Sequence, residues 1–414
     1  MTLRDEAEEI GREAVNAMLP DTAVRSALAQ RSPNGRVVLV AIGKAGWSMA
    51  KAAWDELGSQ IERGIVITKD GHSNGEIGPL AIREASHPII DERALAATEE
   101  ALAMVRDLSS DDTVLFLVSG GGSALFEKPV EGISLQELQE ITDTLMNAGA
   151  DIVTLNAVRK RCSAVKGGRF ALAAAPARVE ALILSDVLGD RLDSIASGPA
   201  AADQITTDEV IAMVRRFGLA GHHAVARVLT RETPKRLDNV HSRIIGSVSV
   251  LCERARKELV KRGYTTLQLT STVNGEAAEI GKLLAEIARE VRQRGQPLPP
   301  PCAVLIGGET VVSVRGNGTG GRNQEMALAA AISIAGFENT VVLCLASDGT
   351  DGPTDATGGL VDGGSAARIR GAGLDPRELL ANNDSYRALE ASGDLLRSGP
   401  TGTNVNDIAV VLCR

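Results

Sequence analysis

One glycine-rich segment of this chain has the residue types that bind an anion. Residues 316–325 read Gly-Asn-Gly-Thr-Gly-Gly-Arg-Asn-Gln-Glu, between a β-type run at 311–314 and an alanine-rich run at 326–335. We expect a strand, a loop and a helix in this order, with unpaired backbone N–H groups beside the helix N-terminus. Arg322 adds a positive charge there. The segment predicts an anion site, with a plain tight turn as the alternative.

Two further glycine-rich loops follow apolar runs that are typical of buried strands. Residues 37–42 lead into Gly-Lys-Ala-Gly, which contains Lys44, and residues 114–118 lead into Ser-Gly-Gly-Gly-Ser at 119–123. Glycine lets backbone approach a ligand closely, so the second loop predicts a cradle for phosphate or carboxylate. Lys44, at a strand end beside two glycines, can reach a phosphate or a carboxylate. It lies outside any Walker A motif, and a surface role is the alternative.

Cationic and acidic residues follow other apolar runs. Residues 156–169 concentrate lysine and arginine, which an acidic protein needs in order to bind an anion, although a solvated helix face would carry the same charges. Asp190 follows the run 181–184 and is the best candidate for a base that acts on a substrate hydroxyl. Asp348 and Asp351 follow the run 341–346, a position typical of Mg²⁺ ligands, although Asp-Gly pairs also form turns.

The composition excludes several classes of partner. Hydrophobic residues make up 44% and charged residues 23%, as in an ordinary globular protein. Aromatic residues make up only 2%, which argues against base stacking on a single strand. The net charge of −9 argues against nucleic acid and anionic membranes as partners, and leaves small anions bound by local lysine and arginine.

The cysteines and the apolar runs indicate a cytoplasmic protein. The five cysteines are widely spaced without a C-x-x-C motif, which is typical of reduced, mostly buried thiols. The first residues predict a charged amphipathic helix rather than a signal peptide. The apolar runs are too short to cross a membrane.

Short apolar runs alternate with helical stretches along most of the chain, which predicts an α/β fold with parallel sheets covered by helices. In such folds ligands bind at the carboxyl ends of the strands. The expected strands are 37–42, 64–68, 114–118, 181–185, 304–306 and 341–346, and the expected helices are 46–57, 93–108, 134–146, 156–164 and 277–293. A polar linker near residues 230–242 divides the chain into domains at 1–236 and 237–414.

Taken together, the motifs match a known family over essentially the whole length. They are Ile-Gly-Lys-Ala-Gly at 42–46, Ser-His-Pro at 86–88, Ser-Gly-Gly-Gly-Ser-Ala at 119–124, Lys-Gly-Gly at 166–168, Ser-Asp-Val at 185–187, Gly-Asp at 189–190, Ser-Gly-Pro at 197–199, Gly-Gly-Glu-Thr at 307–310, Gly-Gly-Arg-Asn-Gln-Glu at 320–325, Ser-Asp-Gly-Thr-Asp-Gly at 347–352 and Thr-Asn-Val-Asn-Asp at 403–407. With these motifs the chain resembles the class II glycerate kinases, whose C-terminal half carries the MOFRL domain.

The resemblance implies transfer of a phosphoryl group from ATP, with Mg²⁺, to D-glycerate, giving 2-phosphoglycerate. It also implies two three-layer α/β/α domains, a Rossmann-like one with a mainly parallel sheet and then a MOFRL-type one with a mixed sheet, and an active site in the cleft between them. Lys44, Asp190 and Arg322 are the implied catalytic residues. Asp348 and Asp351 are the candidate metal ligands. The candidate substrate- and phosphate-binding residues are Ser119, Gly120, Gly121, Gly122, Ser123, Asn156, Arg159, Lys166, Gly318, Gly320, Gly321, Asn323 and Glu325.

Two other functions compete with the kinase. Gly316, Gly318 and Gly321 satisfy G-x-G-x-x-G, which would suit an NAD(P)-dependent hydroxypyruvate reductase, but a ribose-binding acid about twenty residues later is missing. A sugar-phosphate binding module would explain the loop at Lys44 and leave the second domain without a purpose. Which glycerate hydroxyl reacts, and whether the chain forms a homodimer, stay open.

Overall fold

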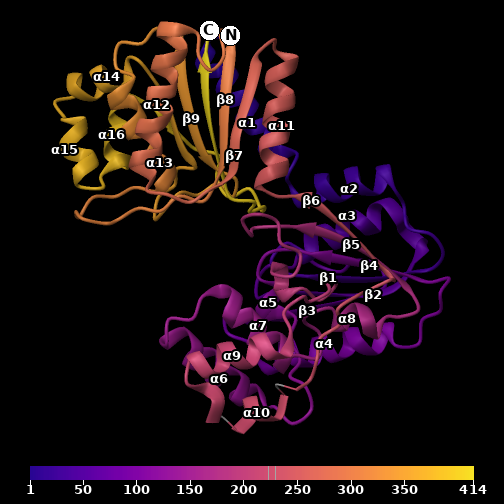
Figure 1. Cartoon of the computed structure of the whole chain (residues 1–414). Helices are drawn as coiled ribbons and strands as arrows, with labels where there is room; N and C mark the ends of the chain where they lie inside the picture. Colours follow the sequence, from indigo (N-terminus) through magenta and orange to yellow (C-terminus); the bar gives the residue numbers. More distant parts are fainter. Residues whose placement is uncertain (222, 229) are drawn as a thin grey trace. The chain divides into compact units, whose positions relative to one another are not determined.

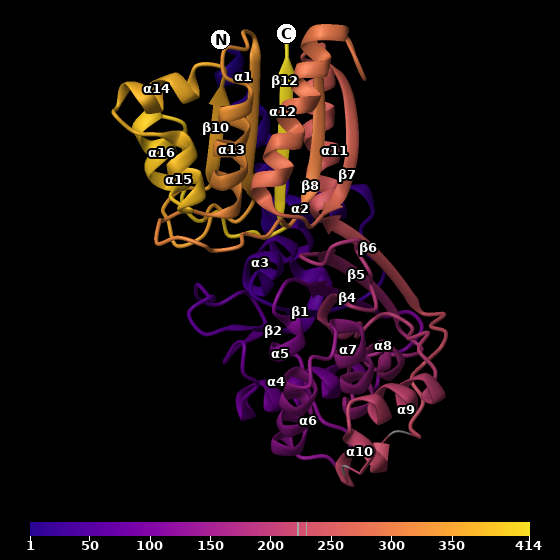
Figure 2. The ribbon, with the colours of Figure 1, turned by 60° about the vertical axis from the view of Figure 1, so that its left-hand side comes forward.

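The structure, a computed structural model, describes residues 1–221, 223–228 and 230–414. Its contacts divide the chain into two compact units. We call residues 20–245 the parallel-sheet unit, and residues 1–19 with 246–414 the mixed-sheet unit. Each is an α/β unit built on its own six-stranded sheet, as expected from the sequence (Figures 1 and 2).

The parallel-sheet unit has strand order β3-β2-β1-β4-β5-β6. Neighbouring strands from β3 to β5 pair in parallel. The strands are β1 (Val37–Ile42), β2 (Ile61–Lys69), β3 (Leu80–Ala85), β4 (Thr113–Val118), β5 (Arg178–Leu184) and β6 (Val240–Gly246). The helices are α2 (Pro20–Gln30), α3 (Gly46–Leu57), α4 (Glu92–Val105), α5 (Gly122–Leu125), α6 (Leu135–Asn147), α7 (Ile152–Cys162), α8 (Arg169–Ala173), α9 (Thr207–Arg216) and α10 (His223–Val228).

Alternate residues of the central strand β1 serve two separate cores. Val37, Leu39 and Ala41 pack with α2 and α3 on one face, whereas Val38 and Val40 pack with α4 on the other. Because both faces are covered, every residue of β1 is buried, which explains the unbroken apolar run in the sequence. Helices α6, α7 and α9 enclose a further small core around Leu138, Val158 and Val210.

The mixed-sheet unit has strand order β11-β10-β9-β12-β8-β7. Strands β7 and β8 pair in parallel, and β12 pairs antiparallel with both β8 and β9. The strands are β7 (Thr265–Val273), β8 (Cys302–Gly308), β9 (Thr340–Ala346), β10 (Gly358–Asp362), β11 (Leu395–Leu396) and β12 (Asp407–Cys413). The helices are α1 (Leu3–Asn16), α11 (Val248–Lys261), α12 (Ala277–Arg294), α13 (Arg322–Ser333), α14 (Ser365–Gly371), α15 (Pro376–Ala381) and α16 (Ser385–Ser392). Figure 1 shows α1 and α11 on one face of this sheet and α12 and α13 on the other.

The predicted strands and helices are all present, with ends shifted by a few residues, except at 311–314. That run forms only an isolated bridge between Val311 and Glu276, and Val311 and Val314 are largely exposed. The β-branched residues suggested a strand, but within the described residues the run pairs only at that bridge. The glycine segment 316–321 therefore follows an irregular connection rather than a strand.

The division into units differs from the predicted boundary after residue 236. The segment read as a linker is tied to the parallel-sheet unit, because Thr233 Oγ1 donates to Asp203 at 2.8 Å and Asn239 Nδ2 donates to the carbonyls of Ala171 and Ala177 at 2.9 Å. The polar composition of the segment thus reflects side chains that hydrogen-bond within the unit. The chain leaves this unit only at 245, within the last residues of β6.

The N-terminal helix α1, which the sequence could not assign to a domain, belongs to the mixed-sheet unit. Tyr264 donates its hydroxyl to Glu6 at 2.9 Å, and Arg262 bonds Glu9 and Glu13 at 3.1 and 3.0 Å. Gly11 lies directly on β9, where a Cβ atom would be 2.6 Å from a methyl of Leu345. The amphipathic helix thus packs one face on β9 and pairs its acids with cations beside it.

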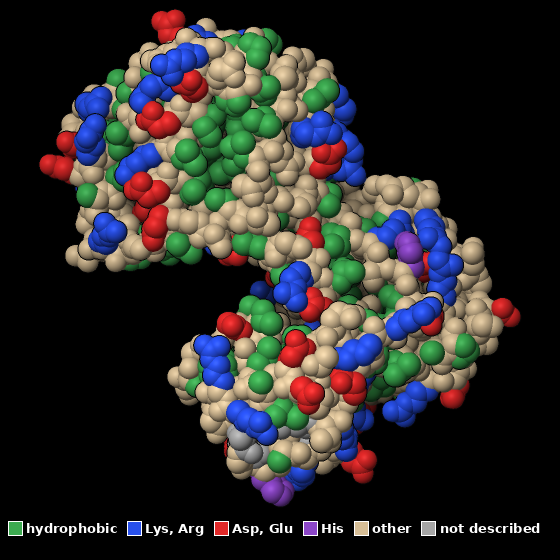
Figure 3. Space-filling model, viewed as in Figure 1, with side chains coloured by type: hydrophobic (Ala, Val, Ile, Leu, Met, Phe, Trp, Pro, Cys, Tyr) green, Lys and Arg blue, Asp and Glu red, His purple; other side chains and the backbone are tan. Residues whose placement is uncertain are grey.

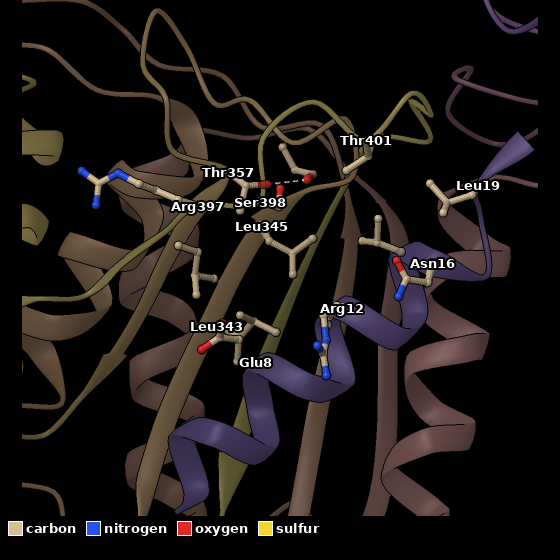
Figure 4. A pocket seen from close by; sticks show the side chains of 14 residues that line it. Glu8, Arg12, Asn16, Leu19, Leu343, Leu345, Thr357, Arg397, Ser398 and Thr401 are labelled. Carbon is tan, nitrogen blue, oxygen red and sulfur yellow. Dashed lines mark hydrogen bonds between the residues drawn. The ribbon is translucent and has the colours of Figure 1, made fainter.

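A cavity of about 380 Å³ lies beside α1 and is lined by residues of the helix and of β9. Val15 and Leu19 are among the lining residues. Leu343 and Leu345 of β9 lie across the cavity from Leu19 (Figure 4). Thr401 lies at the end nearest the loop that follows β9. Three charged side chains, Glu8, Arg12 and Arg397, also line this cavity, so its lining combines aliphatic and charged groups.

The distribution of charged side chains on the surface agrees with the sequence, which has no large excess of basic residues. Acidic and basic side chains are interspersed on the face shown in Figure 3, without one large basic patch. All five cysteines are buried thiols without disulfides, as expected. None of the helices in the described part of the chain has the length and hydropathy that a membrane crossing requires.

Candidate active site

Strands β1 and β4 form the switch point of the parallel sheet. From β1 the chain adds β2 and β3 on one side, and from β4 it adds β5 and β6 on the other. Loops that leave two such strands diverge, and the crevice between them is where ligands bind in open α/β sheets. Lys44 follows β1 and the loop 119–123 follows β4, so both predicted loops lie at this point.

The two loops are hydrogen-bonded to each other. The Lys44 N–H donates to the Gly120 carbonyl at 2.9 Å, and the Ala45 N–H donates to Ser119 Oγ at 3.1 Å. Ser119 Oγ in turn donates to the Ile42 carbonyl at 3.1 Å. The buried Ser119 side chain therefore joins the two loops. Gly120 and Gly121 form the part of the 119–123 loop that we call the glycine rim.

We expect Gly43→Ala to destabilise this junction by more than the backbone strain alone, which is about 1–3 kcal/mol. Gly43 has φ +103°, and a Cβ atom there would lie 2.4 Å from the Ser119 carbonyl oxygen. Gly58 is the matched control, since it also has positive φ (+53°) but open space around it. Urea unfolding should give a larger loss for Gly43→Ala than for Gly58→Ala. Equal losses would contradict the close approach of the loops.

Two side chains at the glycine rim were not predicted as site residues. A Cβ atom on Gly121 would lie 3.1 Å from His87 Nε2 and 3.3 Å from Lys44 Cγ. A Cβ atom on Gly120 would lie 2.5 Å from Asp186 Oδ2. Both residues belong to motifs that carry the family resemblance, which was the available signal. Burial and the charge of Lys44 lower the pKa of His87, so its imidazole is neutral near neutral pH.

Asn156 and Arg159 support the 119–123 loop from behind. Ser123 Oγ lies 3.2 Å from Ser197 Oγ, which donates to Asn156 Oδ1 at 3.1 Å. Arg159 Nη2 donates to the Ser123 carbonyl at 3.2 Å. Asp190 lies after β5, the strand next to β4, at the same edge of the sheet, with φ +54° in its turn.

The cationic segment 156–169 does not present its charges as predicted. Lys160 pairs with buried Asp203 at 3.1 Å, and Arg161, fully buried, pairs with Glu232. Lys166 and Glu127 form an ion pair in which both side chains have no exposed surface. Burial lowers the pKa of Lys166 to about 8. Lys166 thus holds the chain after α5 in place instead of facing an anion.

In the mixed-sheet unit, the glycine segment and the loop after β9 line one cleft of about 620 Å³. The sequence predicted that these segments would serve one site, and the structure brings them together. The candidate residues that line the cleft are Gly318, Gly320, Gly321, Arg322, Glu325, Asp348 and Asp351.

The N–H groups of residues 316–319 in the glycine segment already have acceptors within the protein, so they do not form an open anion cradle. Asn383 Oδ1 accepts from Arg315 N and Gly316 N at 2.7 and 3.1 Å. The neighbouring residues 382 and 384 accept from the N–H groups of residues 317–319 at 3.0–3.1 Å. A side chain on Gly316 would strike Asn382, which explains the glycine. Residues 382–384 thus hold the glycine segment in place along the cleft. The sequence analysis did not predict this contact, because the two segments are more than sixty residues apart in the chain.

Asp351 also has a place other than the predicted metal site. Its carboxylate accepts from Asn323 N at 3.1 Å and from Gln324 N and Nε2 at 2.9 and 3.0 Å, so it caps α13. Burial raises its pKa, and those hydrogen bonds oppose the rise. Asn323 is fully buried and also bonds Asp351, so it supports the helix start rather than a substrate.

The other two acidic residues of the cleft, Asp348 and Glu325, differ in how far their carboxylates are free to bind a metal ion. Asp348 lies in the turn after β9, where Oδ1 accepts from Thr350 N at 3.0 Å. Glu325 bonds Asn383 Nδ2 at 2.9 Å, and burial raises its pKa. Across residues 1–221, 223–228 and 230–414 no three histidine, cysteine or acidic side chains are grouped as metal ligands. Mg²⁺ commonly uses one or two carboxylates together with phosphates and waters, so Asp348 fits a nucleotide-borne Mg²⁺ and Asp351 does not.

Arg322 is the first residue of α13 and its guanidinium is held by two carboxylates. Nε and Nη2 bond Asp407 at 2.6 and 3.2 Å, and Nη1 bonds Glu309 at 2.7 Å. The sheet explains this convergence, because β8 ends one residue before Glu309 and Asp407 begins the antiparallel strand β12 opposite Gly308 and Ala346. Burial disfavours the Arg322 charge, but these carboxylates more than offset it and raise the pKa.

Comparison with known proteins agrees with this architecture. A domain model described as a domain of unknown function, DUF4147, matches residues 6–230, and the MOFRL family model matches residues 302–407. The D-glycerate 2-kinase of Thermotoga maritima is 49% identical, over 99% of this chain and 98% of its own length. This chain belongs to the glycerate kinase family.

One solved structure and one further relative of this glycerate kinase family member bear on its fold and function. A crystal structure of the Thermotoga maritima glycerate kinase superimposes with a TM-score of 0.95 at 48% identity and covers 100% of this chain and 99% of that one. A protein of Agrobacterium vitis named as a putative hydroxypyruvate reductase is 40% identical over 96% of this chain and 92% of its own. The relatives thus carry two activity names, glycerate kinase and, at lower identity, putative hydroxypyruvate reductase.

Proposed function

We propose that this chain is an ATP-dependent kinase that phosphorylates D-glycerate at its 2-hydroxyl. The observation that carries the proposal is the full-length match to a D-glycerate 2-kinase at 49% identity. The position of Lys44 and the 119–123 loop at the switch point supports it, as does the cleft beside Arg322.

The reaction is a transfer of one phosphoryl group. The 2-hydroxyl oxygen of glycerate attacks the γ-phosphorus, the bond from phosphorus to the β–γ bridging oxygen breaks, and ADP leaves. Asp190 would orient the hydroxyl and take its proton. Lys44 in the parallel-sheet unit and Arg322 in the mixed-sheet unit would each neutralise charge on a bound anionic group. Mg²⁺ supplies charge neutralisation at the phosphates, and Asp348 is the residue that would hold it or its waters.

The reductase alternative finds little support in the glycine segment. A dinucleotide fingerprint needs glycines between a strand and a helix, with N–H groups directed at a pyrophosphate. Here no strand precedes residues 316–321, and most N–H groups of the segment bond residues 382–384. The glycines instead allow close packing against that segment.

The deciding experiment measures ADP release from ATP and Mg²⁺ with and without D-glycerate, then couples the product to enolase. Glycerate-dependent ADP whose product feeds enolase directly supports a 2-kinase. A need for added phosphoglycerate mutase would move the proposal to the 3-hydroxyl. Hydroxypyruvate-dependent NAD(P)H oxidation without ADP release would replace it with a reductase. In the same assay Lys44→Ala and Asp190→Asn should lose turnover, and Lys51→Ala, an exposed lysine of α3, should not.

The kinase should also lose kcat/KM as the pH falls through about 6. Burial raises the pKa of Asp407 from 3.8 to about 6, and Arg322 offsets only part of this rise. Protonated Asp407 no longer accepts both Arg322 hydrogen bonds. The free energy of unfolding has the opposite pH dependence. Because the pKa of Asp407 is higher in the folded protein than in the unfolded chain, its contribution to stability is present below the pKa of the unfolded chain and is lost as the pH rises through about 6. A pH profile of kcat/KM, flat through this range, would contradict the prediction.

A further inference from the structure

Arg322 is held by two carboxylates that differ greatly in their exposure. Asp407 contacts two nitrogens of the guanidinium, and its side chain is only 6% exposed. Glu309 contacts one nitrogen, and its side chain is 45% exposed. The guanidinium itself is 31% exposed and lines the cleft.

The free-energy cost of breaking the contact with Arg322 therefore differs between Asp407 and Glu309. Removing a buried partner leaves a charge without its counter-charge away from water, which is costly, whereas an exposed carboxylate that leaves is rehydrated at little cost. The main chain of Glu309 is fixed, because its N–H donates to the Val273 carbonyl at 2.8 Å. Its side chain can rotate away from Arg322 without moving β8.

We propose that Asp407 is a permanent anchor that positions Arg322, and that Glu309 occupies the oxyanion position on Arg322 Nη1 until a substrate anion displaces it. The incoming group is a phosphoryl or carboxylate oxyanion. The proposal rests on the proposed function, in which Arg322 binds such a group. Glu309 then sets the affinity for that anion, and Asp407 sets the geometry in which it reacts.

Three variants of the full chain separate these roles. Glu309→Gln removes the competing charge, so the anion that contacts Arg322 should bind about two- to fivefold tighter with kcat nearly unchanged. Asp407→Asn keeps the volume but weakens the anchor, so kcat should fall about 100-fold with a smaller change in KM. Glu279→Gln removes an exposed charge of α12 in the same unit and is the control.

Calorimetric titration with ATP and, separately, with D-glycerate identifies which ligand supplies the oxyanion. Tighter binding of one of them by Glu309→Gln, absent in Glu279→Gln and lost in the double variant Glu309→Gln/Arg322→Ala, supports displacement. Unchanged or weaker binding of both, or tightening that persists without Arg322, overturns it. If glycerate-dependent ADP release is absent but the tightening depends on Arg322, the kinase assignment fails and the displacement stands. If Asp407→Asn does not fold, the titrations of Glu309→Gln still decide whether a substrate anion displaces Glu309 from Arg322.

Discussion

Arg322→Ala is expected to lower kcat/KM for glycerate phosphorylation by about 10³-fold or more, the effect of removing an arginine that stabilises charge in phosphoryl transfer. Arg322 presents a fixed guanidinium at the cleft, oriented by Asp407 and Glu309. Alanine removes that charge and leaves Asp407 buried without its cation. We expect the loss mainly in kcat, measured as ADP release at saturating ATP.

Arg315→Ala is the matched control for this experiment. Arg315 precedes the same glycine segment and is exposed, and it engages Asn383 through its backbone N–H, which alanine retains. It should keep near-normal turnover. Near-normal turnover in Arg322→Ala would remove this residue from the mechanism and, with it, the role we give to Glu309.

Lys166→Ala is expected to cost about 3–5 kcal/mol of stability, because it leaves Glu127 as a buried charge without a partner. Both side chains are fully buried, and Lys166 Nζ also donates to the Ser123 carbonyl at 2.9 Å. Urea unfolding measures the loss. The double variant Lys166→Met/Glu127→Leu should recover much of it, since an apolar pair can replace a buried ion pair.

The outcome also distinguishes two roles for Lys166. A variant that unfolds at much lower urea supports the structural role. A variant with normal stability, but with a large rise in KM for ATP, would restore the phosphate contact that the sequence suggested for this lysine.

The features that depend on residues close together in the chain, such as strands and the loops after them, were the most predictable. The apolar runs located most strands of the parallel sheet, and the glycines after β1 and β4 marked its switch point. Those inferences need only the periodicity of a strand and the rule that ligands bind at strand ends.

Partners from distant parts of the chain were not predictable from such patterns. The glycine segment at 316 looked like an open cradle, but Asn382 and Asn383 bond its N–H groups. Asp351 resembled a metal ligand, yet it caps α13 across a separation of about thirty residues. A carboxylate or a lysine has the same appearance in sequence whether it faces a ligand or a buried partner. Only the fold decides between them.

The placement of α1 has a consequence for synthesis of the protein. Its packing partners, β9 and α11, are encoded after the entire parallel-sheet unit, residues 20–245. During translation α1 therefore leaves the ribosome long before the surface it covers, with its apolar face unpaired while the intervening unit can already fold. The mixed-sheet unit can close only after β12 (Asp407–Cys413), which lies between β8 and β9 in the sheet, has been made.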